Sequence, residues 1–350
     1  MTSSGDATIR YRLPPRVLPE DEARDLWVDC GRLTTRPLTD AELLPGRFAL
    51  AGLVDAHAHL ALAPADGSAT SLETVLASLR LNRDAGVLLV RDVGAPQSVT
   101  LRLEADPALP RYQVAGRWHA RKDRFFEQWH DPVEPDELLA AAIAEIHAGA
   151  RWIKVLADWR APELTYPPAL LEALAEAVHN AGARLAVHAQ WDGVREVVAA
   201  GADSIEHGCL IDRETVRSMA ERGTAWTPTI STFADELPLE APAAAHERRA
   251  AWLENYRAML PVAAAAGVVI MAGTDTAGTV VDEVRTLIEF GLTPVQALRA
   301  ATTDARRFLG EASLDDGAPA DVVTFEEDPR EDPSALARPA SVVLAGYRVR

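Results

Sequence analysis

The sequence has few cysteines, few lysines and no long apolar runs. Its 350 residues include two cysteines, Cys30 and Cys209, which are too few for a disulfide framework. We expect Cys209 to be a small buried hydrophobe and not a nucleophile. The apolar stretches are too short or too interrupted to span a bilayer, and the first residues lack a basic segment followed by an apolar one. These absences predict a cytoplasmic protein.

Positive charge is scarce relative to negative charge. The chain carries 35 Lys and Arg against 52 Asp and Glu, a formal net charge of -17. This excess argues against nucleic acid or an anionic membrane as a partner. Its simplest consequence is solubility. A homo-oligomer is compatible with the sequence.

From residue 51 onward, short β-rich runs alternate with helical patterns, which predicts repeated βα units around a parallel sheet. The helical segments 135–148 and 167–181 each have a proline near the start and a glycine just beyond the end. The eight β-rich runs, the number that closes a (β/α)8 barrel, are residues 52–56, 86–91, 112–115, 152–156, 184–188, 203–206, 225–229 and 268–272.

The two ends of the chain differ from its middle. Residues 1–50 and 311–350 contain short β-like stretches separated by turns rich in proline and acidic residues. We expect the two ends to pair into a small β-sandwich-like domain beside a barrel of residues 51–310. The predicted fold class is therefore α/β, a TIM-type barrel with a β domain formed by both termini. The length agrees, since such barrels take about 250 residues.

His57 and His59 directly follow the apolar run 48–54. In an extended strand, side chains at i and i+2 share a face, so both imidazoles can bind one metal ion. The alternative is that each histidine hydrogen-bonds to the backbone. The position at the exit of a hydrophobic strand favours the metal interpretation.

Four other predicted strands place a polar residue at or near their carboxyl ends, which is where barrel enzymes form their active sites. These residues are Lys154, His188, His207 and Asp275. With the histidine pair, they bring four of the chain's nine histidines, a lysine and an aspartate to one mouth. Core packing alone does not account for this set.

Lys154 is one of only two lysines, the other being Lys122. A buried ammonium group is costly unless it is paired, and burial lowers its pKa. The neutral amine can take up carbon dioxide to form a carbamate, whose two oxygens suit a bridge between two metal ions. The alternative is an unmodified lysine paired with a carboxylate such as Asp275.

Asp275 can serve as a metal ligand and can also take the proton from an attacking water. The alternative is a helix cap after Gly273.

Together these motifs resemble the amidohydrolase superfamily and, within it, the Xaa-Pro dipeptidases and imidazolonepropionase-like hydrolases. The resemblance extends from about residue 47 to the end of the chain. It rests on ordered motifs at residues 52–59, 149–155, 186–189, 201–208, 273–275, 293–302 and 317–323.

The resemblance implies a binuclear centre bridged by carboxylated Lys154. His57, His59 and Asp275 would hold one ion, and His188 and His207 the other. Zinc is the expected metal, although manganese, cobalt or iron could substitute. A hydroxide that bridges the ions would cleave an amide or peptide-type C–N bond of a small substrate, with Asp275 as proton acceptor.

Two loops depart from the family pattern, after the third predicted strand and after Lys154. We expect substrate contacts there and after the fifth strand, from Arg117, His119, Arg160 and Trp191. The alternative is that these are ordinary surface loop residues.

Three other functions remain open. In a mononuclear cyclic-amide hydrolase or deaminase, Lys154 would stay a free amine. A lactonase would use the same ligands. A catalytically idle barrel would only bind its ligand.

Overall fold

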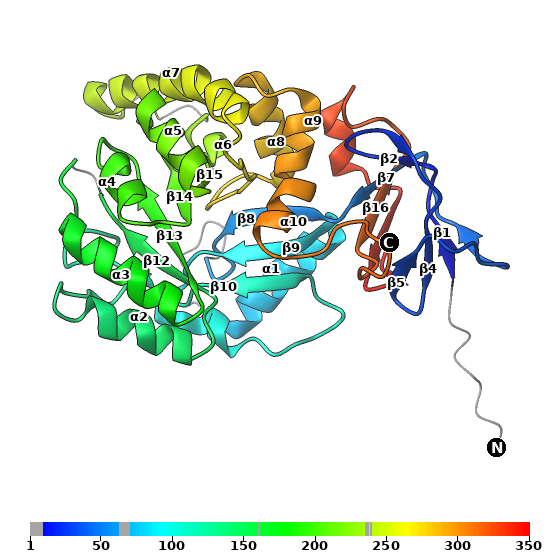
Figure 1. The fold of residues 1–350 in the computed structure, drawn as a ribbon, viewed down its shortest axis with the longest axis horizontal. Helices are drawn as coiled ribbons and strands as arrows, with labels where there is room; N and C mark the ends of the chain where they lie inside the picture. Colours follow the sequence, from blue (N-terminus) through cyan, green and yellow to red (C-terminus); the bar gives the residue numbers. More distant parts are fainter. Residues whose placement is uncertain (1–9, 63–70, 160–161, 235–237, 239) are drawn as a thin grey trace.

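The computed structural model describes residues 10–62, 71–159, 162–234, 238 and 240–350. Figure 1 shows parallel strands surrounded by helices, with the short strands of both chain ends gathered to one side. Within the described ranges, no helix is both long and apolar enough to cross a membrane.

The larger part of the fold contains two parallel sheets. The first has three strands, in the order β10 (Arg111–Val114), β9 (Val87–Asp92) and β8 (Leu53–Ala58). The second has five, in the order β11 (Trp118–His119), β12 (Trp152–Leu156), β13 (Arg184–Ala189), β14 (Ser204–His207) and β15 (Ala225–Thr227). All neighbours pair in parallel, as the predicted βα units require.

The third expected strand is present as β10, and a further short strand, β11, follows it. Strand β10 pairs with β9, and β11 pairs with β12. Gly116 lies between the halves with φ +73°, and a Cβ there would lie 1.9 Å from a carboxylate oxygen of Glu145. The positive φ favours glycine at this turn.

The eighth expected strand, residues 268–272, is not a continuous strand, but the segment lies between β15 and β8 and hydrogen-bonds to both. Ile270 forms an isolated parallel bridge with Trp226, and the amide of Ala56 in β8 donates to the carbonyl of Ala272. The amide of Ala272 donates instead to the carbonyl of Ala300, so a continuous ladder with β8 does not form. The described residues therefore show an α/β fold with two parallel sheets and not one uninterrupted ring of strands.

Helices cover the outside of these sheets (Figure 1). They are α1 (Leu72–Asp84), η1 (Pro96–Arg102), α2 (Leu138–His147), α3 (Pro168–Asn180), α4 (Val194–Ala199), α5 (Arg213–Arg222), α6 (Ile230–Ala234), α7 (Ala243–Ala265), α8 (Val280–Glu289), α9 (Pro294–Ala300) and α10 (Thr303–Phe308). Helices α2 and α3 confirm the two helical segments expected around residues 135–148 and 167–181.

The chain ends form two smaller sheets. One has the order β5 (Arg32–Thr34), β4 (Trp27–Asp29), β1 (Tyr11–Arg12) and β6 (Glu42–Leu43). The other has the order β18 (Tyr347–Arg348), β17 (Ser341–Leu344), β16 (Val322–Phe325), β7 (Phe48–Ala51), β2 (Arg16–Val17) and β3 (Glu22–Ala23), and η2 (Pro333–Ala337) lies between β16 and β17 in the chain. The antiparallel pair of β7 with β16 joins the two chain ends. The domain boundaries at residues 50/51 and 310/311 stay predictions.

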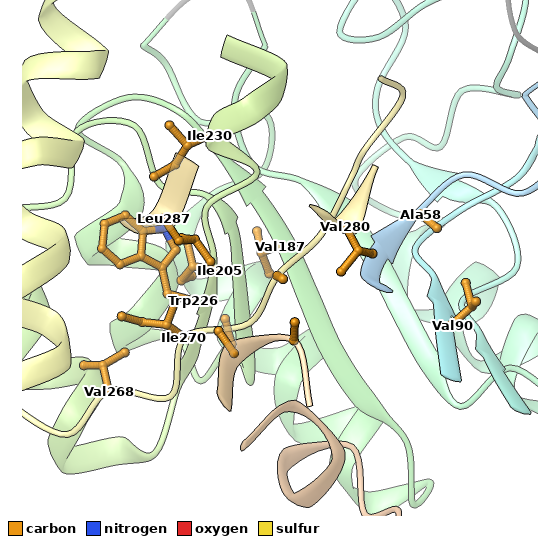
Figure 2. Close-up of a cluster of buried hydrophobic side chains, with 14 of the residues drawn as sticks. Ala58, Val90, Val187, Ile205, Trp226, Ile230, Val268, Ile270, Val280 and Leu287 are labelled. Carbon is orange, nitrogen blue, oxygen red and sulfur yellow. The ribbon is translucent and has the colours of Figure 1, made fainter. Parts of the chain in front are cut away.

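The main core lies between the parallel strands and the helices. Figure 2 shows Val187 and Ile205 from the strands near Trp226, Ile230 and Leu287. Side chains alternate along each strand, so Ile153 and Val155 of β12 face this core. Lys154 lies between them and faces the other way, so this strand accommodates a lysine although its other residues are apolar.

Candidate metal centre

His57 and His59 lie at the end of β8, and each uses Nδ1 for a hydrogen bond. Nδ1 of His57 lies 2.6 Å from Oε2 of Glu206, and Nδ1 of His59 lies 2.9 Å from the carbonyl oxygen of Gly94. Since a carboxylate and a carbonyl only accept, both Nδ1 atoms donate. Nε2 of each ring is thereby left available as a metal ligand.

Asp275 brings a carboxylate to the same two imidazoles. Its Oδ1 lies 3.2 Å from Nε2 of His59 and 3.7 Å from Nε2 of His57. Its amide donates to the carbonyl of His57 at 2.7 Å, which fixes the residue at φ +54°. One ligand atom from each of the three residues lies within 4.8 Å of the others. Asp275 is not a helix cap, because Thr279 caps the helix that follows, α8.

The charge of Asp275 is maintained by its neighbours. Burial alone would raise its pKa, but the nearby imidazoles of His59, His57 and His207 hold the pKa below its usual range. The carboxylate is therefore ionised, as a metal ligand or proton acceptor must be.

His188 and His207 end the neighbouring strands β13 and β14. Their ring centroids lie 4.5 Å apart, and the ring of His207 lies 5.0 Å from that of His57. Nδ1 of His207 lies 2.8 Å from the hydroxyl oxygen of Thr229. Nε2 of His188 is buried and has no hydrogen-bond partner among the described residues.

Lys154 is buried, and within the described part of the chain its Nζ also lacks a hydrogen-bond partner. Burial lowers its pKa to about 8, although Glu206 and Asp275 act in the opposite direction. The alternative of a hydrogen bond between Lys154 and Asp275 is not seen. A buried amine with a lowered pKa is the group that carboxylation requires.

A buried ion pair that was not predicted from the sequence lies behind His57 and supports it. Nη2 of Arg91 lies 2.8 Å from Oε1 of Glu206, and the hydroxyl of Ser204 donates to the same oxygen at 2.6 Å. Burial alone would raise the pKa of Glu206, but Arg91 and His57 lower it well below its usual value. The available signal was that Arg91 and Glu206 are charged residues inside apolar β-rich runs.

Six residues, which we call the ligand set, line one cavity of about 240 Å³: His57, His59, Lys154, His188, His207 and Asp275. The other lining residues are Leu62, Trp118, Phe125, Phe126, Trp129, Leu156, Trp159, Gln190, Phe233 and Thr276. The structure thus brings together all six residues expected at the metal centre. Most of the remaining surface of the cavity is apolar.

Three of the four residues expected to contact substrate, Arg117, His119 and Trp191, do not line this cavity, and their role stays a prediction. Arg117 pairs with Glu145 at 3.4 Å and does not line the cavity. His119 is also absent from the lining, because alternation along β11 directs Trp118 into the cavity and turns His119 away.

The ring of Trp191 packs 5.9 Å from that of Trp252, again outside the cavity lining. Arg160 lies outside the described residues. Cys209 is buried with its Sγ 3.1 Å from the hydroxyl of Tyr256, and burial raises the pKa of its thiol, which confirms a packing role.

The sequence pattern of the amidohydrolase family matches residues 48–349. The chain belongs to this family. An uncharacterized protein of Mycobacterium tuberculosis is 36% identical over 346 residues, which cover 94% of this chain and 93% of that protein.

Two solved structures share the fold. The Xaa-Pro dipeptidase with bound methionine has a TM-score of 0.80 at 22% identity and covers 97% of this chain and 100% of its own. The Aspergillus niger ochratoxinase has a TM-score of 0.81 at 20% identity and covers 98% of this chain and 96% of its own. In the sequence search, ochratoxinase is 29% identical over 226 residues, which are 59% of this chain and 47% of that enzyme.

The ligand set fits the metal ion that this amidohydrolase-family fold implies. With Nδ1 of His59 donating to Gly94, its Nε2 presents a lone pair to the ionised carboxylate of Asp275 at 3.2 Å. A cation bound between them would satisfy both atoms. The unpartnered buried atoms, Nζ of Lys154 and Nε2 of His188, line the same cavity. The donor set of imidazole and carboxylate suits a divalent transition metal.

Proposed function

We propose that this protein is a metal-dependent hydrolase that cleaves an amide or peptide-type C–N bond in a small substrate. The observation that carries the proposal is the convergence of the ligand set on one cavity, with three of its ligand atoms within 4.8 Å of one another. We further propose that the two parallel sheets form a (β/α)8 barrel and that the chain ends form its β domain. The similarity to the Xaa-Pro dipeptidase and ochratoxinase structures supports this arrangement.

In this proposal the ligand set holds two divalent ions. His57, His59 and Asp275 would hold one ion, His188 and His207 would hold the other, and carboxylated Lys154 would contact both. Zinc is the expected metal, and manganese, cobalt or iron could replace it. Bound ions of this kind lower the pKa of a water molecule and polarise a substrate carbonyl.

Asp275 is the residue that moves the proton. Its ionised carboxylate faces the cavity and can accept a proton from the water that attacks the substrate carbonyl carbon. A C–O bond forms, the C–N bond breaks, and Asp275 returns the proton to the leaving nitrogen. Arg91 and Glu206 fix the orientation and tautomer of His57 throughout.

Two of the relatives support an amide-type substrate to different degrees. The dipeptidase acts on dipeptides, and its fold covers nearly the whole of this chain. Ochratoxinase adds a second hydrolase-type relative through both sequence and fold. We therefore place dipeptides and N-acyl amino acids first among the substrates to be tested.

A mononuclear centre is the second candidate. The compact group of His57, His59 and Asp275 favours it, because these three residues alone offer a complete set for one ion. Lys154 would then stay a free amine, and His188 or His207 would contact substrate. A cyclic-amide hydrolase or a deaminase would use such a centre.

One experiment tests the proposal. The purified protein is stripped of metal, reconstituted with zinc or manganese in the presence of bicarbonate, and assayed with dipeptides, N-acyl amino acids, cyclic amides and lactones. We expect metal-dependent turnover of at least one linear amide, with about two equivalents of metal per chain. About one equivalent with turnover of cyclic amides supports the mononuclear candidate. Bound metal without turnover of any compound contradicts the proposed hydrolase.

A further inference from the structure

One side of the cavity is an aromatic wall, which we define as Trp118, Phe125, Phe126, Trp129 and Trp159. The centroid of the Phe126 ring lies 4.5 Å from that of Trp129 and 4.9 Å from that of Trp159. The rings of Phe125 and Trp159 lie 5.1 Å apart. The five residues therefore form one continuous cluster, although they come from two separate segments of the chain.

The aromatic wall adjoins both sides of the ligand set. The ring of Trp118 lies 5.3 Å from that of His59, and the ring of Trp159 lies 5.7 Å from that of His188. A group that packs against the aromatic wall is thus held beside the residues proposed to carry the chemistry.

The aromatic wall is not fully covered by the protein. Trp118 is buried, but Phe125, Phe126, Trp129 and Trp159 are each half-buried while they line the cavity. Concave apolar surface beside a few convergent polar groups is the usual character of a small-molecule site. Flat rings add a geometric preference, because aromatic groups pack on one another in offset or edge-to-face arrangements.

The side chains of the aromatic wall are themselves uncharged. Among the described lining residues, the only formally charged ones are Lys154 and Asp275, both in the ligand set. The apolar rings of the wall therefore suit a flat apolar group of a substrate.

We propose that the aromatic wall binds an aromatic group of the substrate, so that the substrate class is an amide with an aryl or arylalkyl group next to the scissile bond. This inference rests on the proposed function, since it assigns the selectivity of the same site. Gln190 and Thr276, the two uncharged polar residues of the lining, supply the hydrogen bonds that orient the polar part of such a substrate.

The first test compares small amides on the metal-loaded protein. Four compounds combine an acetyl or phenylacetyl group with glycinamide or phenylalaninamide. We expect kcat/KM for the best aryl amide to exceed that of N-acetylglycinamide by roughly tenfold or more. Equal kcat/KM across the panel overturns the inference while the proposed hydrolase function stands.

Variants connect the preference to the aromatic wall. Phe126→Ala and Trp129→Ala should raise KM for the aryl amides more than they lower kcat, and should shrink the ratio of aryl to acetyl substrates. Phe308→Ala is the matched control, because Phe308 is also half-buried but packs against Arg184 and Trp152 outside the cavity lining. If Phe308→Ala changes the ratio as much as Phe126→Ala does, the wall is not the source of selectivity.

A binding measurement separates this inference from the proposed function. The full chain without added metal is titrated with phenylacetyl-phenylalaninamide and with N-acetylglycinamide, and intrinsic tryptophan fluorescence reports occupancy because three tryptophans belong to the wall. We expect saturable binding of the aryl amide alone, weakened roughly tenfold in Phe126→Ala. If the aryl amide binds in this way but no amide is hydrolysed, the proposed function is refuted and the aromatic site stands. Equal binding of both amides refutes the aromatic site.

Discussion

The ligand set and the aromatic wall line the same cavity but are built in different ways. Apart from Asp275, the ligand set lies on the parallel strands or directly beyond them, and its imidazoles are fixed through their second nitrogen or by neighbouring rings. The aromatic wall lies mainly on the connections after β11 and β12, and ring contacts hold it together. The difference teaches that the strand ends set the positions for chemistry, whereas the connections can change selectivity without disturbing them.

The largest expected effect comes from removing the charge of Asp275. Asp275→Asn keeps the size of the side chain but removes the proton acceptor and weakens the cation site with His57 and His59. We expect kcat to fall by about a thousandfold or more, with metal content measured alongside the rate. A variant that keeps both its metal and its rate would show that Asp275 is needed neither for metal binding nor for catalysis.

Lys154→Ala should produce the next largest effect. It removes the proposed bridging group, so we expect one of two metal equivalents and most of the activity to be lost, with partial rescue by a short carboxylic acid. The control is Lys122→Ala, since Lys122 is exposed and is the only other lysine. Full metal occupancy in Lys154→Ala would contradict the bridging role.

Glu206→Gln tests whether the buried support behind His57 is part of the metal centre. Gln can no longer compensate Arg91 or accept strongly from Nδ1 of His57, so metal affinity should fall by roughly 10- to 100-fold. The control is Glu283→Gln, a buried glutamate that accepts from the amides of Ile230 and Ser231 and contacts no member of the ligand set. Metal titration of the two variants distinguishes them. If the two variants bind metal with equal affinity, Glu206 contributes to the stability of the fold and not to the metal centre.

Gly94→Ala should give the smallest effect and tests the separation between the two regions. The carbonyl of Gly94 accepts from His59, and a Cβ at this residue would lie 2.4 Å from Nε1 of Trp118. We expect about a tenfold loss of metal affinity together with a smaller preference for aryl amides. Gly149→Ala is the control, because Gly149 also has positive φ but a Cβ there meets no atom within 4 Å. If Gly94→Ala lowers only the metal affinity or only the preference for aryl amides, the ligand set and the aromatic wall are independent at this position.

The sequence predicted the ligand set because its members share a simple rule. Each lies in or just beyond a β-rich run, and the carboxyl ends of parallel strands meet at one edge. Seven expected strands are present with small changes in their bounds. For His57 and His59, the spacing of two residues was sufficient to predict that both imidazoles face the same site.

Other features depend on contacts that a single sequence does not reveal. The pairing of Arg91 with Glu206 requires knowledge of which faces of β9 and β14 meet across the interior. Residues 268–272 have the composition of a strand, but the carbonyl of Ala300 takes one of the amides that a ladder would need. His119 was expected at the substrate site, whereas the alternation of a two-residue strand sends Trp118 there.

The central claim is that the ligand set binds metal and that catalysis depends on it. The most direct test is a zinc titration of the metal-free protein in bicarbonate, with bound zinc and kcat/KM for a hydrolysed amide measured on the same samples. We predict that activity rises with bound zinc and reaches a plateau at about two equivalents per chain. Full activity in metal-free protein, or zinc that binds equally well when His57 and His59 are replaced by alanine, would contradict the account.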